Sequence, residues 1–164
     1  MPLRAPISNH LDLYRYWLGK RGSRTMPSRS SLDPMDIPAL LPYLGLVDKV
    51  VGQYRYRLMG TAVVKELGRD LTGAFVGSSF SKAPESVAAL QSIYERVFNT
   101  AQPVFATCEH KTKLNSIHKV SHLILPLSDD GTTVNMSICS HVERFNFDVA
   151  ADIELNGLPV ALSR

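Results

Sequence analysis

The stretch Y-R-Y-R-L-M-G-T-A-V-V-K-E-L-G-R-D-L-T-G, residues 54–73, carries the strongest structural signal in the chain. Its first six residues alternate between two kinds of side chain, which is typical of a strand whose two faces differ. Gly60 allows a turn, Thr61 is well placed to cap a helix over residues 62–67, and Gly68 supplies a left-handed helix end. The stretch therefore predicts a strand, a short helix and a return loop. This arrangement favours a ligand-sensing or partner-binding module over an enzyme.

The segments before this stretch predict one amphipathic helix and one strand. Ser8 or Asn9 can cap a helix from about His10 to Leu18, with Gly19 as its stop. Residues 20–31 have the composition of an exposed linker, and a short helix over residues 39–41 should end near Pro42. The apolar, β-branched run 44–51 predicts the first strand, which Gly52-Gln53 turns into the second.

The segments after it predict a long helix and three strands. Pro84 opens a helix that ends near Thr100, with an apolar stripe of Val87, Leu90, Tyr94 and Val97, widened by Ile93 and Phe98. Strands are expected at residues 104–113, 118–127 and 133–142, and Ser128-Asp129-Asp130-Gly131 is a strong hairpin signal.

This order of elements predicts an α+β fold with a five-stranded antiparallel sheet. We divide the chain into a helical extension and linker (1–43), a core (44–142) and a tail (143–164). Both faces of the fourth strand are apolar, so the N-terminal helix is expected to cover the second face. The sequence leaves open whether it covers its own sheet or that of a second subunit.

Composition places the protein among ordinary globular domains. The chain has 164 residues, 45% of them hydrophobic, and a net charge of +3 from 18 basic and 15 acidic side chains. No apolar run is long enough for a membrane span or a signal peptide, so we expect a cytoplasmic protein. The basic N-terminal thirty residues lack an aromatic-interleaved pattern, which favours a solvated surface over a nucleic-acid site.

Five short motifs, taken together, resemble the PAS sensory-domain superfamily, in particular small bacterial single-domain members with an N-terminal helical extension. They are W-x-x-x-R (Trp17, Arg21), L-D-P-x-D-I-P-x-L-L-P (32–42), Y-R-x-x-G-T (56–61), G-R-D-L-T-G (68–73) and L-P-L-S-D-D-G (125–131). Each is common alone, whereas their order and spacing are more specific. The resemblance implies strand order 2-1-5-4-3 and a cavity between the sheet and the helices. It also implies a sensory role exerted through dimerisation or contact with another protein.

Candidate ligand-pocket residues come from the elements around the cavity that the resemblance implies. They are Tyr56, Arg57, Leu58, Asp70, Phe75, Phe80, Phe105 and Ile138. Solid core is the commoner role for such apolar residues. Arg57 needs a partner if both faces of the sheet are covered, and we predict an ion pair with Asp70. The functional alternative is that Arg57 anchors an acidic ligand or partner.

The sequence argues against several cofactors. In PAS sensors haem is usually held by a histidine on the helix before the third strand, and residues 85–100 contain none. A flavin photosensor needs a cysteine after the second strand, and residues 60–73 contain none. His110, His118, His122 and His141 lie on the last three predicted strands, but ordinary hydrogen-bonded histidines are favoured over a metal site. Cys108 and Cys139 should be separated by a strand and remain free.

The favoured function is a non-enzymatic regulatory module that signals through protein contacts, with a small ligand in its cavity as a possible trigger. Leu11, Tyr14, Trp17 and Leu18 form the predicted apolar face of the first helix, either as a lid or as a homodimer interface. About twenty residues follow the last predicted strand, so we expect the signal to leave through a separate signalling protein or a homodimer. The alternative is a small-molecule enzyme that uses Asp70, His122 or His141 as acid–base groups.

Overall fold

A single antiparallel sheet organises the protein, whose computed structural model describes residues 8–78, 84–111 and 117–144. The strand order is β2-β1-β5-β4-β3, which confirms the predicted order and the α+β class. The strands are β1 (Leu44–Val50), β2 (Gln53–Met59), β3 (Val104–Lys111), β4 (Ile117–Leu127) and β5 (Met136–Arg144).

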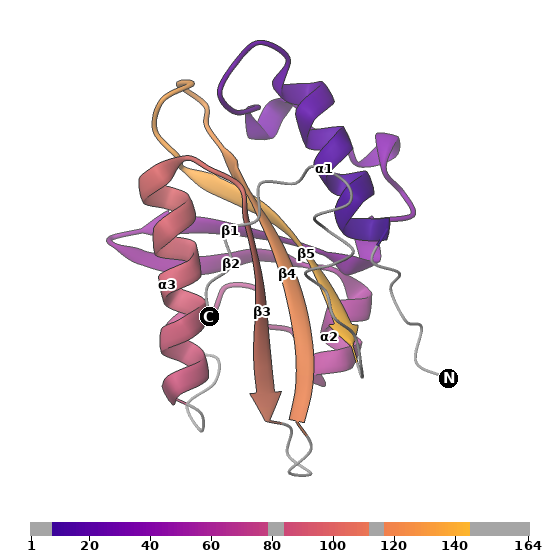
Figure 1. Ribbon diagram of the computed structural model, residues 1–164, viewed down its shortest axis with the longest axis vertical. Helices are drawn as coiled ribbons and strands as arrows, with labels where there is room; N and C mark the ends of the chain where they lie inside the picture. The colour runs from indigo at the N-terminus through magenta and orange to yellow at the C-terminus, as the bar shows by residue number, and fades with distance from the viewer. Residues whose placement is uncertain (1–7, 79–83, 112–116, 145–164) are drawn as a thin grey trace.

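Two helices cover opposite faces of this sheet (Figure 1). On β5 the neighbouring residues Cys139 and Ser140 point to opposite faces. Tyr94 of α3 (Pro84–Thr100) reaches Cys139, whereas His10 of α1 (Ser8–Arg21) bonds Ser140. We call these the α3 face and the α1 face. The remaining elements are α2 (Thr61–Leu67) and four 3₁₀ turns, η1 (Arg29–Ser31), η2 (Pro34–Asp36), η3 (Leu41–Tyr43) and η4 (Val76–Ser78).

Helix α3 packs against the sheet through the apolar stripe that its sequence predicts. Five side chains of the predicted stripe are buried, namely Leu90, Ile93, Tyr94, Val97 and Phe98, whereas Val87 is half-buried. The ring of Tyr54 on β2 stacks on Tyr94 at 5.8 Å between centroids and contacts Phe98 at 5.1 Å. These aromatic contacts fix the β1–β2 hairpin against α3.

Helix α1 covers its own sheet through the predicted apolar residues and through three buried residues that were not predicted. The helix continues through Gly19 to Arg21, and its buried residues are Asn9, His10, Leu13 and Trp17. Of the predicted face, Trp17 is fully buried, while Leu11, Tyr14 and Leu18 are half-buried and pack against the core. The prediction omitted His10 because a polar residue that is fully buried is not revealed by an apolar period.

A β-bulge in the β1–β2 pair changes the face of the last residues of β2. Val47 pairs with Tyr56 and Leu46 pairs with Leu58, so Arg57 is the extra residue of β2. Tyr56 and Leu58 therefore point to opposite faces, although simple alternation places them together. Leu58 is 44% exposed, which corrects the expectation that it lines a cavity with Tyr56.

Several local predictions were wrong for identifiable reasons. The expected helix at residues 39–41 is replaced by the turns η2 and η3, because prolines interrupt this segment. Thr61 is the first residue of α2 and the N-cap is Gly60, whereas Gly68 ends α2 in the left-handed conformation as predicted. Strand β5 begins at Met136 because the preceding loop is held by Asp130, which accepts bonds from the Thr132 and Thr133 amides.

Candidate ligand pocket

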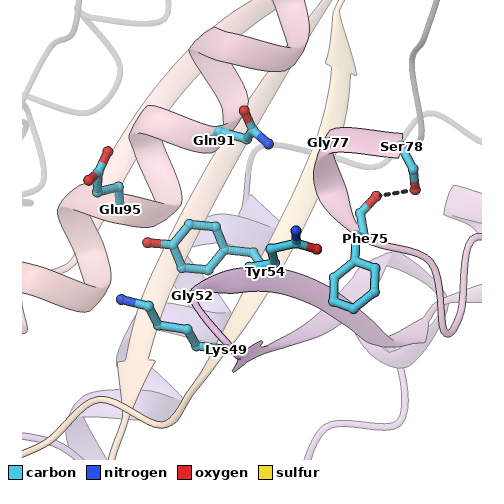
Figure 2. Close-up of a pocket in the computed structure, with 9 residues that line it drawn as sticks. Lys49, Gly52, Tyr54, Phe75, Gly77, Ser78, Gln91 and Glu95 are labelled. Atoms are coloured by element: carbon cyan, nitrogen blue, oxygen red, sulfur yellow. Dashed lines mark hydrogen bonds between the residues drawn. The ribbon is translucent and has the colours of Figure 1, made fainter.

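A pocket opens between the β1–β2 hairpin, the turn η4 and helix α3 (Figure 2). We call it the hairpin pocket. Its volume is about 590 Å³, within the range of small-molecule sites in proteins. Nine of the described residues line it: Lys49, Gly52, Gln53, Tyr54, Phe75, Gly77, Ser78, Gln91 and Glu95.

The return loop after α2 forms the wall opposite the helix. The Tyr56 amide donates to the Ala74 carbonyl at 3.0 Å, and the Gly73 amide donates to the Tyr56 carbonyl at 2.7 Å. A single β-bridge joins Arg55 to Phe75. These bonds fix the loop along the outer edge of β2, so Phe75 and the turn η4 that follows it are held beside the hairpin.

The two ends of the hairpin pocket differ in chemistry. In Figure 2, Lys49, Glu95 and the hydroxyl of Tyr54 lie at one end, while Phe75 and Ser78 lie at the other. The Lys49 Nζ atom is 5.7 Å from the centre of the Tyr54 ring. Burial, together with the charge of Glu95, raises the pKa of Tyr54 above its usual value, so its hydroxyl remains a hydrogen-bond donor at neutral pH.

Gly77 keeps space between η4 and α3. A Cβ atom at this position would lie 2.5 Å from Nε2 of Gln91, the mobile end of a side chain. A small substituent would push the Gln91 amide aside, and a large one would occupy the pocket. Gly77 is therefore a position at which a larger side chain would fill the pocket without altering a strand.

Among the predicted pocket residues that the structure describes, Phe75 alone lines the hairpin pocket. Tyr56 is buried on the α3 face. Phe105 contacts the ring of His10, and Ile138 pairs with Leu46 in the register of the α1 face, so both lie across the sheet from the pocket. Phe80 lies outside the described residues.

The predicted ion pair between Arg57 and Asp70 is wrong. The Arg57 guanidinium lies 3.6 Å from Oδ2 of Asp48, whose carboxylate is bonded more closely by Arg55 at 2.7 Å. Asp70 accepts bonds from the amide and the hydroxyl of Thr72, which lowers the pKa of its carboxyl. Because the bulge leaves the Arg57 side chain 51% exposed, it does not need a buried counter-charge.

A second polar cluster lies between the sheet and α3. His122 and His141 occupy paired positions of β4 and β5, and their Nδ1 atoms are 2.7 Å apart. His141 Nε2 lies 3.3 Å from the Cys139 thiol, which is 3.8 Å from the Tyr94 hydroxyl. Burial raises the pKa of Cys139 to about 12, so this thiol is neutral and unreactive. Among the described residues, no three His, Cys, Asp or Glu side chains are grouped so as to hold a metal ion.

The strand register determines which of the predicted strand histidines are neighbours. His122, and not His118, is paired with His141. Asp70 is bonded to Thr72 instead of to either ring, so the carboxylate–histidine pair of the enzyme hypothesis does not form. The two cysteines lie on β3 and β5, separated by β4 as predicted, and Cys139 is a free thiol.

The polar residues of the hairpin pocket were missed by the sequence interpretation. Gln91 and Glu95 are four residues apart on α3, a spacing that places them on one side of the helix. Lys49 lies three residues before Gly52, the first residue of the predicted hairpin turn. The sequence contains no signal for the contact between the hairpin and α3, which brings Lys49 close to Glu95, more than forty positions later in the chain.

Comparison with known proteins agrees with this architecture. The family model described as "PAS domain" matches residues 6–139. The chain belongs to the PAS domain family. PAS domains are sensory modules, and this chain has the fold of one. None of the curated proteins matches the sequence.

The similar solved structures are distant in sequence and share the PAS fold. A light-oxygen-voltage domain studied with a flavin analogue has 10% identity and a TM-score of 0.56, covering 74% of this chain and 90% of that chain. The PAS domain of Bordetella pertussis BvgS has 15% identity and a TM-score of 0.54, covering 74% and 88%. Vibrio cholera VqmA, solved in a complex with ligand and DNA, has 15% identity and a TM-score of 0.56, covering 81% and 62%.

Proposed function

We propose that this PAS chain is a regulatory module in which a small molecule in the hairpin pocket alters the protein contacts that the chain makes. The observation that carries the proposal is the pocket itself, about 590 Å³ in volume and bounded by three separate elements. An occupant would touch β1, η4 and α3 together. Its binding energy would therefore act on the relative position of hairpin and helix.

The lining residues favour a small polar molecule that also has an apolar part. Lys49 offers a cation and Glu95 an anion at one end, and the Gln53 and Gln91 side chains offer amide donors and acceptors. Phe75 provides an aromatic surface at the other end. We therefore expect a ligand that carries both a charged or hydrogen-bonding group and a flat or apolar group.

We propose that the output is a contact between proteins, either a homodimer or a separate signalling protein, made through α1. The half-buried residues Leu11, Tyr14 and Leu18 flank the buried side of this helix and remain partly accessible. Trp17 does not belong to this proposed interface, because it is 1% exposed and its indole N–H donates to the Pro126 carbonyl at 2.8 Å.

The division into an extension (1–43), a PAS core (44–142) and a tail (143–164) is part of this proposal, as is a cytoplasmic location. Within residues 8–78, 84–111 and 117–144, no helix has the length and apolar character to cross a membrane. The proposal assigns no catalytic step, since Asp70 is bonded away from His122 and His141.

A ligand screen with two matched variants tests the proposal. Thermal unfolding of the full chain would be followed with a panel of amino acids, nucleosides and small carboxylic acids. A compound at a hundred times its Kd should stabilise the wild type by about 2.7 kcal/mol. Gly77→Leu, which fills the pocket, should abolish this shift.

Gly19→Leu is the control, because a Cβ at Gly19 meets nothing within 4 Å and the position lies on α1, away from the pocket. This variant should keep the ligand-dependent shift. A stabilising compound that acts equally on Gly77→Leu would show that the ligand binds elsewhere and would contradict the proposed site.

A further inference from the structure

Two opposite charges line the hairpin pocket from different walls. Lys49 belongs to β1 and Glu95 to α3, and both side chains are exposed. Within the part of the chain that the structure describes, neither of them forms an ion pair, with the other or with a third residue. The pocket therefore offers one cation and one anion whose charges are not already matched by an ion pair.

Both charges flank the ring of Tyr54. The Lys49 Nζ atom is 5.7 Å from the centre of this ring, and the charge of Glu95 contributes to the raised pKa of the Tyr54 hydroxyl. In the view of Figure 2, this hydroxyl lies between the Lys49 ammonium and the Glu95 carboxylate. The cation, the anion and a neutral hydroxyl donor are thus gathered at the same end of the pocket.

The sequence neighbours of Lys49 do not compensate its charge. Lys49 is paired with Tyr54 in the strand register, so its side chain lies on the α3 face. The adjacent pair, Asp48 and Arg55, lies on the other face of the hairpin, and these two side chains bond each other at 2.7 Å. The Lys49 ammonium is therefore available to a ligand in the pocket.

A ligand with a single charge matches this end of the pocket poorly. An anion attracted by Lys49 would also be repelled by Glu95, and a cation attracted by Glu95 would be repelled by Lys49. A molecule that carries both charges meets an opposite charge on each wall. In a free α-amino acid the ammonium and the carboxylate are attached to the same carbon atom, so both can reach this end of the pocket together.

The rest of the pocket can hold the side chain of such a molecule. Gln91 lies one helical turn before Glu95 on α3, and Gln53 lies across from it on β2. In the described residues neither carboxamide is hydrogen-bonded. At the far end Phe75 provides an aromatic ring, in a turn that the Ser78 hydroxyl fixes by donating to the Phe75 carbonyl at 2.9 Å. An aromatic ligand ring gains from contact with another ring beyond the area that it buries.

We propose that the ligand of the hairpin pocket is a free α-amino acid with an aromatic side chain, whose carboxylate binds Lys49 and whose ammonium binds Glu95. Its side chain extends past Gln53 and Gln91 towards Phe75. This inference rests on the proposed function, since it names the ligand of the same site. The pocket distinguishes an amino acid from an amine or an acid of the same shape, because each of these leaves one pocket charge without a partner.

Calorimetric titration of the 164-residue chain tests this charge requirement on the wild type. L-Phenylalanine, L-tyrosine and L-tryptophan would be titrated first, and the tightest of them compared with the two analogues that lack one charge. For tryptophan these are tryptamine, without the carboxylate, and indole-3-propionate, without the ammonium. Each analogue should bind about tenfold more weakly than the amino acid. An amine or acid that binds as tightly as the amino acid would overturn the inference.

Two variants assign each charge to its wall. Lys49→Gln should weaken binding of the amino acid about tenfold without weakening that of the amine, and Glu95→Gln should weaken binding of the amino acid without weakening that of the acid. Lys65→Gln and Glu66→Gln are the matched controls, because both residues lie on α2 and do not line the pocket. The controls should bind as the wild type does. Equal weakening of the amino acid and the amine by Lys49→Gln would contradict the assigned contact.

Gly77→Leu separates failure of this inference from failure of the proposed function. An aromatic amino acid that binds this variant as tightly as the wild type occupies another site, which would overturn the inference. Binding of a different compound of the screening panel, lost in Gly77→Leu, without binding of any aromatic amino acid would also overturn it and leave the proposed function intact. A wild type that binds no compound at all would overturn both.

Discussion

Trp17 provides the most informative perturbation of the contact between α1 and the sheet. The side chain is 1% exposed, and its indole N–H donates to the Pro126 carbonyl at 2.8 Å. Trp17→Phe keeps most of the apolar contact but leaves that carbonyl unpaired, which should cost about 1–2 kcal/mol. Trp17→Ala also leaves a cavity and should cost about 3–5 kcal/mol. In a chain of this length these losses correspond to decreases in Tm of about 2–8 °C and 6–20 °C.

Thermal unfolding followed by far-UV circular dichroism measures both losses, since the variants remove the only tryptophan. Leu18→Ala, at a half-buried neighbouring position, should cost less than either Trp17 variant. A Trp17→Ala protein within about 0.5 kcal/mol of the wild type would refute the docked helix. A Tm of the wild type that rises with protein concentration would show self-association, which the proposed homodimer requires.

Three further predictions concern other parts of the fold. Gly60→Ala should destabilise the protein by about 1–3 kcal/mol in a denaturant titration, because a Cβ would lie 2.3 Å from the Pro42 carbonyl oxygen; a neutral effect would contradict this close approach. Cys139 should resist a thiol reagent at pH 8 in the native protein and react after unfolding, because burial raises its pKa to about 12; rapid native labelling mapped to this residue would argue against the buried position. Hydrogen bonds from amides and hydroxyls hold the pKa of the Asp130 carboxyl well below its usual range, so the stability that this group contributes should be present above about pH 4 and decline as pH falls below it. Asp130→Ala should remove this pH dependence, while Asp130→Asn should keep part of the loop structure. Equal acid sensitivity of the wild type and Asp130→Ala would contradict this role of Asp130.

Periodicity was sufficient for the parts of the fold in which local sequence and burial agree. The stripe of α3 and the alternation at the start of β2 were predictable because Leu90, Tyr94 and Val97 recur at helical spacing and Tyr54 and Tyr56 at strand spacing. The strand order was available only through the resemblance to PAS domains, since the sequence alone contains no signal for which strands are neighbours.

The errors share a physical origin, which is that contacts between distant segments overruled the local pattern. The bulge at Arg57 reverses the face of Leu58, and one extra residue in a strand is invisible to an alternation rule. His10 is buried because two serines more than a hundred residues away satisfy its ring. The hairpin pocket combines Lys49 and Glu95, whose proximity depends on the packing of the hairpin against α3.

Native mass spectrometry of the freshly purified 164-residue chain tests the central claim most directly, because bound mass and subunit number are read from the same ions. We predict that the wild type and Gly19→Leu carry a small-molecule adduct, and that Gly77→Leu, with its hairpin pocket filled, does not. An adduct retained unchanged by Gly77→Leu, or a wild type that carries no adduct, would contradict a ligand-regulated hairpin pocket.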